Sequence, residues 1–301
     1  MDRPGRRCWV IPRRSLRSWQ TSRRAIPLDR SIVVGILNIT PDSFSDGGRN
    51  YSAADALRSA FQMKEDGADI IDVGGESTRP GAEMPDEQEE IGRVVPVIER
   101  IAAELEVPVS VDTRRAAVAR AALAAGAEIV NDVSGLQFDP DMGEVVAKSG
   151  AGIIIMHMRG TPATMDSMAI YENVVDEVAA ELVQACGRAV MSDVPPERIV
   201  VDPGLGFAKT AGHNLALVAN LERITRLGYP VLIGPSRKRF LGTITGKAVN
   251  ERDPATAAAC VAARMKGATL FRVHDVGIVR EALQVADAVL SSSPLTADRS
   301  P

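Results

Sequence analysis

The segment SIVVGILN (residues 31–38) decides the fold class, because it is a continuous apolar run that ends on a polar side chain. An unbroken apolar run of this length is typical of a strand that is buried on both faces, as in a parallel sheet. The following TPDSFSDGGRN (40–50) is rich in turn formers, and residues 51–67 have helical spacing and end on glycine. The segment therefore predicts one strand–loop–helix unit.

The same unit recurs along the chain. Eight apolar segments each run into a polar or charged residue, and stretches with helical periodicity lie between them. In chain order these residues are Asn38, Asp72, Asp112, Asn131, His157, Asp202, Ser236 (with Lys238) and Arg272 (with His274). We therefore expect a single (β/α)8 TIM barrel, in which such residues converge on one mouth and form the active site. A doubly wound open sheet is the alternative, but its usual five or six strands fit less well.

Composition limits the partners and the compartment. Hydrophobic residues are 45% and aromatics only 4%, which suits a barrel core of Ile, Val, Leu and Ala. The net charge of −4 disfavours nucleic-acid binding, and no apolar run is long enough for a membrane span. Cys8, Cys186 and Cys260 form no CxxC pair, which indicates free thiols in a reducing, cytoplasmic setting. Three histidines and scattered cysteines make a zinc site improbable.

The two ends differ from the body of the chain. Residues 1–30 hold nine Arg and two Asp, and residues 1–24 lack sustained periodicity. We expect 1–24 to be a disordered extension, although Arg-rich, acid-poor transit peptides share this composition. Residues 25–290 would form the catalytic barrel, and 291–301 a polar tail.

Three carboxylates at one mouth need compensation. Asp72, Asp112 and Asp202 would repel one another unless a metal, a cation or a ligand with paired N–H donors lies between them. Each aspartate could instead cap a helix. Asn38 and Asn131 can both donate and accept, which suits a heterocycle or a phosphate oxygen.

Basic residues follow the last two strands. GPSRKRFLG (234–242) and FRVHD (271–275) lie where barrels often bind phosphate. Of Arg237, Lys238 and Arg239, we expect only Lys238 to face the mouth. In the glycine-rich VDPGLGFAKT (201–210), Phe207 could stack on a ring. His157 has the setting of a satisfied buried histidine.

The order of motifs resembles the dihydropteroate synthase family. The blocks are GILNITPDSFSDGG (35–48), IIDVGGESTRPGA (70–82), SVDT (110–113), NDVSG (131–135), MHMRGTPATM (156–165), DPGLGFAKT (202–210), SRKRFLG (236–242) and RVHDV (272–276). They fall in the family's order from about residue 25 to about residue 290.

The resemblance implies an activity. Enzymes of this family join (7,8-dihydropterin-6-yl)methyl diphosphate to 4-aminobenzoate in folate biosynthesis, giving 7,8-dihydropteroate and diphosphate. The family implies Mg²⁺, a homodimer, small-molecule substrates and inhibition by sulfonamides. Its mechanism is dissociative, so diphosphate leaves before the amine attacks.

The resemblance also implies residue roles. The catalytic set is Asp46, Lys238, Arg272 and His274, and the pterin set is Thr78, Asp112, Asn131, Met156, Asp202, Phe207 and Lys238. Diphosphate would contact Asn38, Arg272 and His274, with Mg²⁺ on Asn38. The lids and the 4-aminobenzoate pocket would include Phe44, Ser45, Asp46, Arg79, Pro80 and Ser236.

Two other functions fit the same barrel. A methyltetrahydrofolate methyltransferase domain shares the pterin site but needs no anion pocket, and it would usually accompany a cobalamin module. An inactive copy of the synthase would bind pterin without turnover. The intact TPDSFSDGG (40–48) and SRK (236–238) favour the active synthase.

Overall fold

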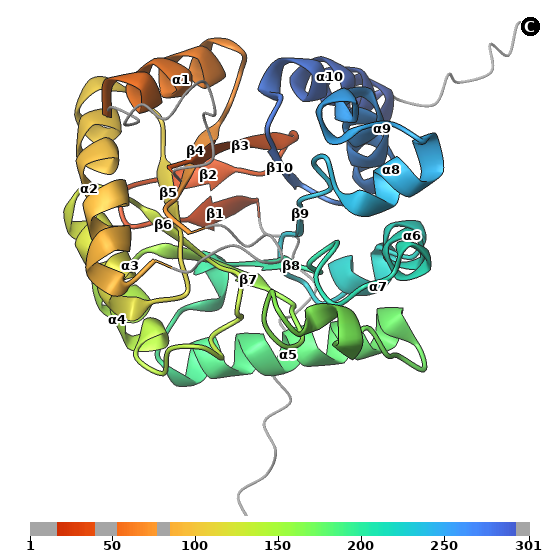
Figure 1. Ribbon diagram of the computed structural model, residues 1–301, viewed down its shortest axis with the longest axis horizontal. Coiled ribbons are helices and arrows are strands. Elements are labelled where there is room, and N and C mark those ends of the chain that lie inside the picture. The colour runs from red at the N-terminus through yellow and green to blue at the C-terminus, as the bar shows by residue number, and fades with distance from the viewer. Residues whose placement is uncertain (1–16, 40–52, 77–84, 293–301) are drawn as a thin grey trace, which may run out of the picture.

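A computed structural model of the chain describes residues 17–39, 53–76 and 85–292 and shows a (β/α)8 barrel (Figure 1). The parallel strands are β3 (Ile32–Asn38), β4 (Ile70–Gly74), β5 (Val109–Asp112), β6 (Ile129–Asp132), β7 (Gly152–Met156), β8 (Ile199–Asp202), β9 (Leu232–Ile233) and β10 (Leu270–Val273). They pair in the order β8-β7-β6-β5-β4-β3-β10-β9, and a bridge between Val201 and Val231 links the two ends. The expected fold class is confirmed.

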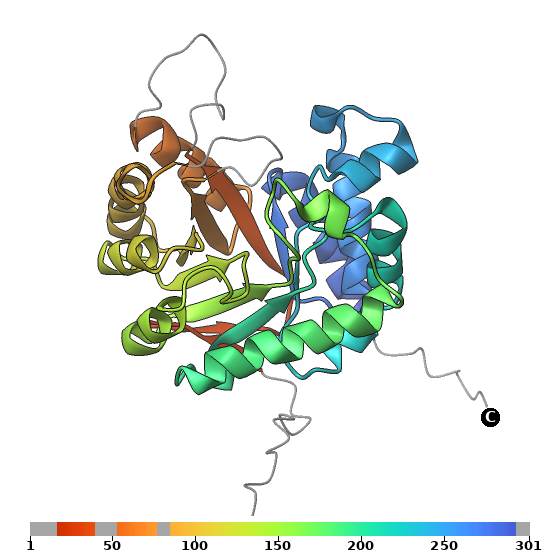
Figure 2. The ribbon, with the colours of Figure 1, turned by 60° about the horizontal axis from the view of Figure 1, so that its bottom comes forward.

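Helices surround this sheet, as both ribbon views show (Figures 1 and 2). They are α1 (Ala53–Glu65), α2 (Glu87–Glu104), α3 (Ala116–Ala124), α4 (Met142–Ser149), α5 (Val174–Met191), α6 (Ala211–Ala219), α7 (Glu222–Thr225), α8 (Arg239–Thr245), α9 (Asp253–Arg264) and α10 (Val276–Ser291). Helix α6 begins directly after Thr210, whose side chain caps it by accepting the His213 N–H. Within the described residues, no helix has the length and apolarity to cross a membrane.

Strand alternation decides which side chains point into the barrel. One face of the strands forms a buried interior cluster that includes Ile70, Ile129 and Val200. The other face, including Ile71 and Val201, joins the larger core beneath the helices. Successive side chains of a strand point to opposite faces. Asp72, Asn131 and Asp202 each follow one of these interior residues by two positions, so they also point into the barrel.

A hairpin before the barrel corrects the expected domain boundary. Strands β1 (Ser18–Gln20) and β2 (Ala25–Pro27) pair antiparallel, and Trp19 is fully buried within the interior cluster. The Trp19 Nε1–H donates to the Arg198 carbonyl at 2.8 Å. The ordered part of the chain therefore begins before residue 25. The Arg-rich composition of this segment gave no indication that Trp19 packs against the barrel strands. Residues 1–16 and 293–301 lie outside the described residues.

Candidate active site

Four polar side chains form a connected cluster inside the barrel. The Arg272 Nε–H donates to Asp72 Oδ2 at 2.6 Å, and Nη2–H donates to Asp112 Oδ2 at 2.6 Å. Asn131 Nδ2 also donates to Asp72 Oδ2, at 3.1 Å. Arg272 is thus the cation that the neighbouring carboxylates were expected to need. Asp72 lies within β4 and is fully buried, so it supports the mouth from below.

Burial changes the ionisation of this cluster. Desolvation raises the pKa of Asp112 to about 7, although the charge of Arg272 acts in the opposite direction. The carboxylates Asp72 and Asp112 raise the pKa of Arg272 above its ordinary value, despite the opposing effect of burial. Arg272 therefore remains a cation, and Asp112 holds a proton more readily than an exposed aspartate does.

Asp202 lies at the end of β8, and its carboxylate oxygen Oδ1 accepts the Gly204 N–H at 2.7 Å. Desolvation raises the pKa of Asp202 to about 6, so the group is charged at neutral pH at some cost in stability. Its side chain can accept two parallel N–H donors from a ligand.

Lys238 lies against Phe207, with Nζ 4.0 Å from the ring centroid. Burial lowers the pKa of Lys238 to about 8, and the charge of Arg272 adds to this effect. Gly206 has a φ of +82°, and an added Cβ would come within 2.9 Å of Lys238 Cδ. Glycine at this position therefore admits the lysine.

The other two basic residues of the 237–239 run point elsewhere. Arg237 pairs with Asp253, and Arg239 is exposed and pairs with Asp166. Only Lys238 of the three interacts with the mouth residues, as the sequence led us to expect.

Further candidates line the same mouth. Ser236 Oγ lies 2.8 Å from His274 Nδ1 and accepts the His274 backbone N–H at 3.1 Å. A Cβ added at Gly74 would lie 3.5 Å from Asn38 Oδ1 and 3.8 Å from Asp112 Oδ2, so these two side chains flank that glycine. The mouth thus combines carboxylates, amides, a hydroxyl and cations.

An apolar cluster borders the polar groups. Met156 and Phe207 pack with Val133, Met158 and Met165. A cavity of about 330 Å³ opens beside them, between the loops after β5, β6 and β7, and reaches the mouth at Asp112. Asn131, Asp202 and Lys238 are not among its lining residues. A flat ligand with polar edges would match this combination.

Comparison with known proteins gives the family. Residues 34–274 match the model of the pterin binding enzymes. The chain is 47% identical to dihydropteroate synthase of Synechocystis, over 86% of this chain and 90% of that protein. It is 42% identical to the Escherichia coli enzyme, over 89% of this chain and 95% of the relative.

The chain belongs to the dihydropteroate synthase family. Its fold matches that of Xanthomonas albilineans dihydropteroate synthase solved with 4-aminobenzoic acid, with a TM-score of 0.86 and 42% identity. That match covers 92% of this chain and all of the other. A Yersinia pestis dihydropteroate synthase in a sulfonamide drug complex matches with the same TM-score, at 39% identity over 90% of this chain and 98% of the other.

Several candidates lie outside the described residues. They are Phe44, Ser45, Asp46, Thr78, Arg79 and Pro80. The remaining candidates, from Asn38 to His274, lie at the strand ends or in the loops that follow them.

Sequence reasoning missed a second polar network beneath the loops of this family member. Lys209 is buried and lies 2.9 Å from His157 Nδ1. His157 itself is a satisfied buried histidine, as expected, but it faces helix α5 because its parity is opposite to that of Met156. The alternation along β7 could have indicated this direction.

The described residues contain no group of three or more His, Cys, Asp or Glu side chains arranged to hold a metal. Asn38 offers one neutral oxygen, which is a suitable but insufficient ligand for Mg²⁺. A magnesium ion here would therefore take most of its ligands from water and from a phosphorylated substrate.

Proposed function

We propose that this chain catalyses the reaction of its family, joining (7,8-dihydropterin-6-yl)methyl diphosphate to 4-aminobenzoate. The observation that carries the proposal is the convergence of Asp112, Asn131, Asp202 and Lys238 beside Arg272. Acceptors and donors for a pterin edge thus lie next to a fixed cation for the leaving diphosphate.

Pterin recognition would use the buried polar groups. Asp202, when ionised, would accept the 2-amino and N3–H groups of the ring, and Asp112 and Asn131 would contact other ring nitrogens. Lys238 would contact the ring oxygen and nitrogen, with Thr78, Met156 and Phe207 completing the pocket. The bidentate carboxylate contact would provide selectivity, since an unpaired buried acceptor is costly.

Departure of diphosphate would depend on positive charge and oriented donors. Arg272 has five N–H donors and uses two for Asp72 and Asp112, so others can reach a phosphate oxygen. His274 and Asn38 would assist it. The C–O bond to the pterin methylene breaks with its electron pair on diphosphate, and the 4-aminobenzoate nitrogen then bonds to that carbon and loses a proton.

Mg²⁺ fits this scheme as a partner of the substrate. It would be held by the diphosphate and the Asn38 side chain, where it would neutralise charge on the leaving group. The lid residues Phe44, Ser45, Asp46, Arg79 and Pro80, together with Ser236, would receive 4-aminobenzoate, and Asp46 would assist the attacking amine.

The protein would act as a cytoplasmic homodimer on small molecules, without nucleic acid or membrane. Buried free thiols at Cys186 and Cys260 agree with a reducing compartment. On α10, Ile278, Val285 and Val289 are large apolar side chains exposed on one face, which suits a subunit interface.

The experiment is diphosphate release from the pterin substrate with and without 4-aminobenzoate. The synthase releases one diphosphate for each 4-aminobenzoate consumed, and a sulfonamide competes with that substrate. A methyltransferase would instead transfer a methyl group from methyltetrahydrofolate to cobalamin. Tight pterin binding without diphosphate release would favour the inactive copy.

A further inference from the structure

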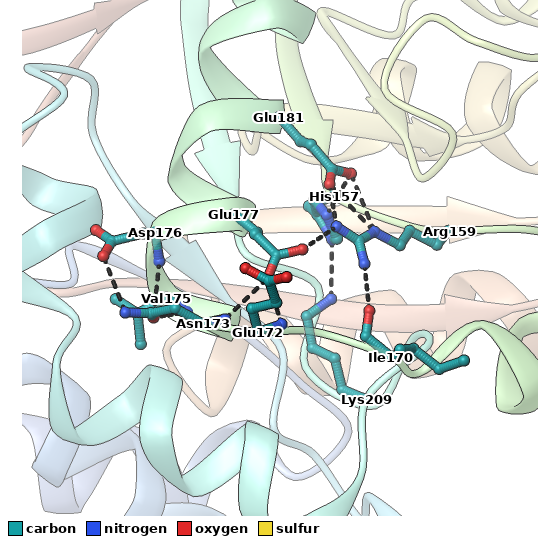
Figure 3. A network of polar contacts seen from close by, with 10 residues as sticks. All are labelled: His157, Arg159, Ile170, Glu172, Asn173, Val175, Asp176, Glu177, Glu181 and Lys209. Carbon is teal, nitrogen blue, oxygen red and sulfur yellow. Dashed lines mark hydrogen bonds and ion pairs between the residues drawn. The ribbon is translucent and has the colours of Figure 1, made fainter.

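A network of charged groups extends from buried Lys209 and His157, in the loops after β8 and β7, to the partly exposed Glu177 and Glu181 on helix α5 (Figure 3). His157 lies between Lys209 and Glu181, with Nδ1 2.9 Å from Lys209 Nζ and Nε2 3.0 Å from Glu181 Oε2. Arg159 bonds to Glu181 and, through Nη2, to Glu177 Oε2 at 2.9 Å. This network lies on the opposite side of β7 from the barrel interior.

The protonation state of Lys209 determines which nitrogen of His157 carries the proton. Lys209 Nζ also donates to the Phe207 carbonyl at 2.9 Å. Only one hydrogen can lie between Lys209 Nζ and His157 Nδ1, so an ammonium at Lys209 requires a neutral histidine that donates from Nε2 to Glu181. Burial lowers the pKa of His157, which agrees with a neutral ring. Glu181 and Glu177 then balance Lys209 and Arg159.

Lys209 anchors the backbone that presents Phe207. The loop contains left-handed residues at Gly204, Gly206 and Ala208, and Ala208 has a φ of +49° although it has a side chain. Such a conformation is unfavourable for a residue with a side chain and persists only when its surroundings hold it. Lys209 Nζ holds it by donating to the carbonyl of Phe207, the residue immediately before Ala208.

The anchored ring in turn supports the mouth. Phe207 packs beneath Lys238, and the same loop begins at Asp202, whose carboxylate accepts the Gly204 N–H. A Cβ at Gly204 would come within 2.0 Å of the His157 carbonyl, so β7 and this loop are in close contact. A shift at Lys209 would therefore move Phe207 and Lys238 together.

We propose that Lys209 is a positioning residue for the pterin site, and that the His157–Glu181 pair holds its ammonium in place. The inference rests on the proposed function, because it assumes that Asp202, Phe207 and Lys238 bind the pterin. A buried ammonium is costly, and burial lowers the pKa of Lys209 to about 7. If packing alone mattered, an apolar side chain of similar length would fill the space without that cost.

The test is the Lys209→Met variant, with Lys148→Met as the control because Lys148 is an exposed ion-paired lysine. Calorimetry with 6-hydroxymethyl-7,8-dihydropterin measures binding, and steady-state kinetics measure both KM values. We expect pterin affinity to fall and the pterin diphosphate KM to rise about 10- to 100-fold. The KM for 4-aminobenzoate should change much less, and Lys148→Met should match wild type within about twofold.

Two substitutions at His157 separate positioning from general destabilisation. The amide oxygen of His157→Asn can replace Nδ1 and still accept from Lys209, whereas His157→Gln reaches Glu181 and loses that acceptor. We expect His157→Asn to bind pterin better than His157→Gln, whatever the stability of Lys209→Met.

The outcomes distinguish the two proposals. Equal pterin binding by wild type and Lys209→Met, or a reversed order of the two His157 variants, would overturn the role of Lys209 alone. A wild-type protein that binds no pterin would overturn the proposed function and this inference with it.

Discussion

Asp202 illustrates how a residue proposed to bind the substrate can oppose stability. Its carboxylate is buried, and desolvation raises its pKa to about 6. The folded state therefore binds more protons than the unfolded state between about pH 4 and pH 6, and the stability contributed by this group falls as pH rises through that window. Well above pH 6 the carboxylate is fully charged, and the whole cost of burying its charge lowers the free energy of unfolding.

We predict that Asp202→Asn stabilises the protein while it weakens pterin binding. The gain in free energy of unfolding should be about 3 kcal/mol at about pH 8 and about half that at about pH 5. Urea unfolding at both pH values measures it. If Asp202→Asn were less stable than the wild type at the higher pH, Asp202 would not be a destabilising buried acid.

Arg272 has a second role that the sequence did not indicate. We predict that Arg272→Met lowers the free energy of unfolding by about 3–5 kcal/mol, because it leaves Asp72 and Asp112 without their cation. Adding Asp72→Asn should restore part of the stability but none of the activity, which denaturation and product assays measure. Full stability of Arg272→Met alone would contradict this account.

At the residue scale, the sequence predicted the polar strand ends but not their contacts. Arg272 lies on β10 and His274 follows it by two residues, so strand alternation places both side chains on one face, at the mouth. The Arg272–Asp72 pair was not predictable, because it joins residues 200 positions apart whose distance depends on barrel closure. His157 also follows a strand, but strand alternation turns its side chain away from the mouth and toward helix α5.

At the scale of elements, the β1–β2 hairpin contributes a plug for the barrel interior. We predict that Trp19→Ala lowers the free energy of unfolding by about 3–5 kcal/mol, because a fully buried indole is lost. Trp19→Phe should cost less, since it keeps an aromatic ring and loses mainly the bond to Arg198. Thermal unfolding measures both variants. An unchanged Tm for Trp19→Ala would contradict the packing of this hairpin.

The hairpin was missed for a physical reason. Its strands have three residues each, which is too short for a period to emerge, and arginines surround them. The helices between the strands are easier to recognise, because their apolar spacing persists over several turns, as in α5 and α10.

At the scale of the whole molecule, the exposed apolar face of α10 predicts self-association. Val285→Glu places a charge in the proposed interface and should shift the protein to monomers in analytical ultracentrifugation. Gln284→Glu adds the same charge at the neighbouring exposed position and should leave the dimer intact. A dimer unaffected by Val285→Glu would exclude this face as the interface.

The fold was predictable because eight repeats of one strand–helix unit have few ways to close. The function required the mouth as a whole, since each strand-end residue alone also fits a cap or a loop contact.

The most direct test is the coupling of labelled 4-aminobenzoate to the pterin diphosphate in the presence of Mg²⁺, followed by chromatography. We predict labelled 7,8-dihydropteroate from the wild-type protein and none from folded Asp202→Ala. Absence of product from the wild type, or an undiminished yield from Asp202→Ala, would contradict the proposed reaction or its site.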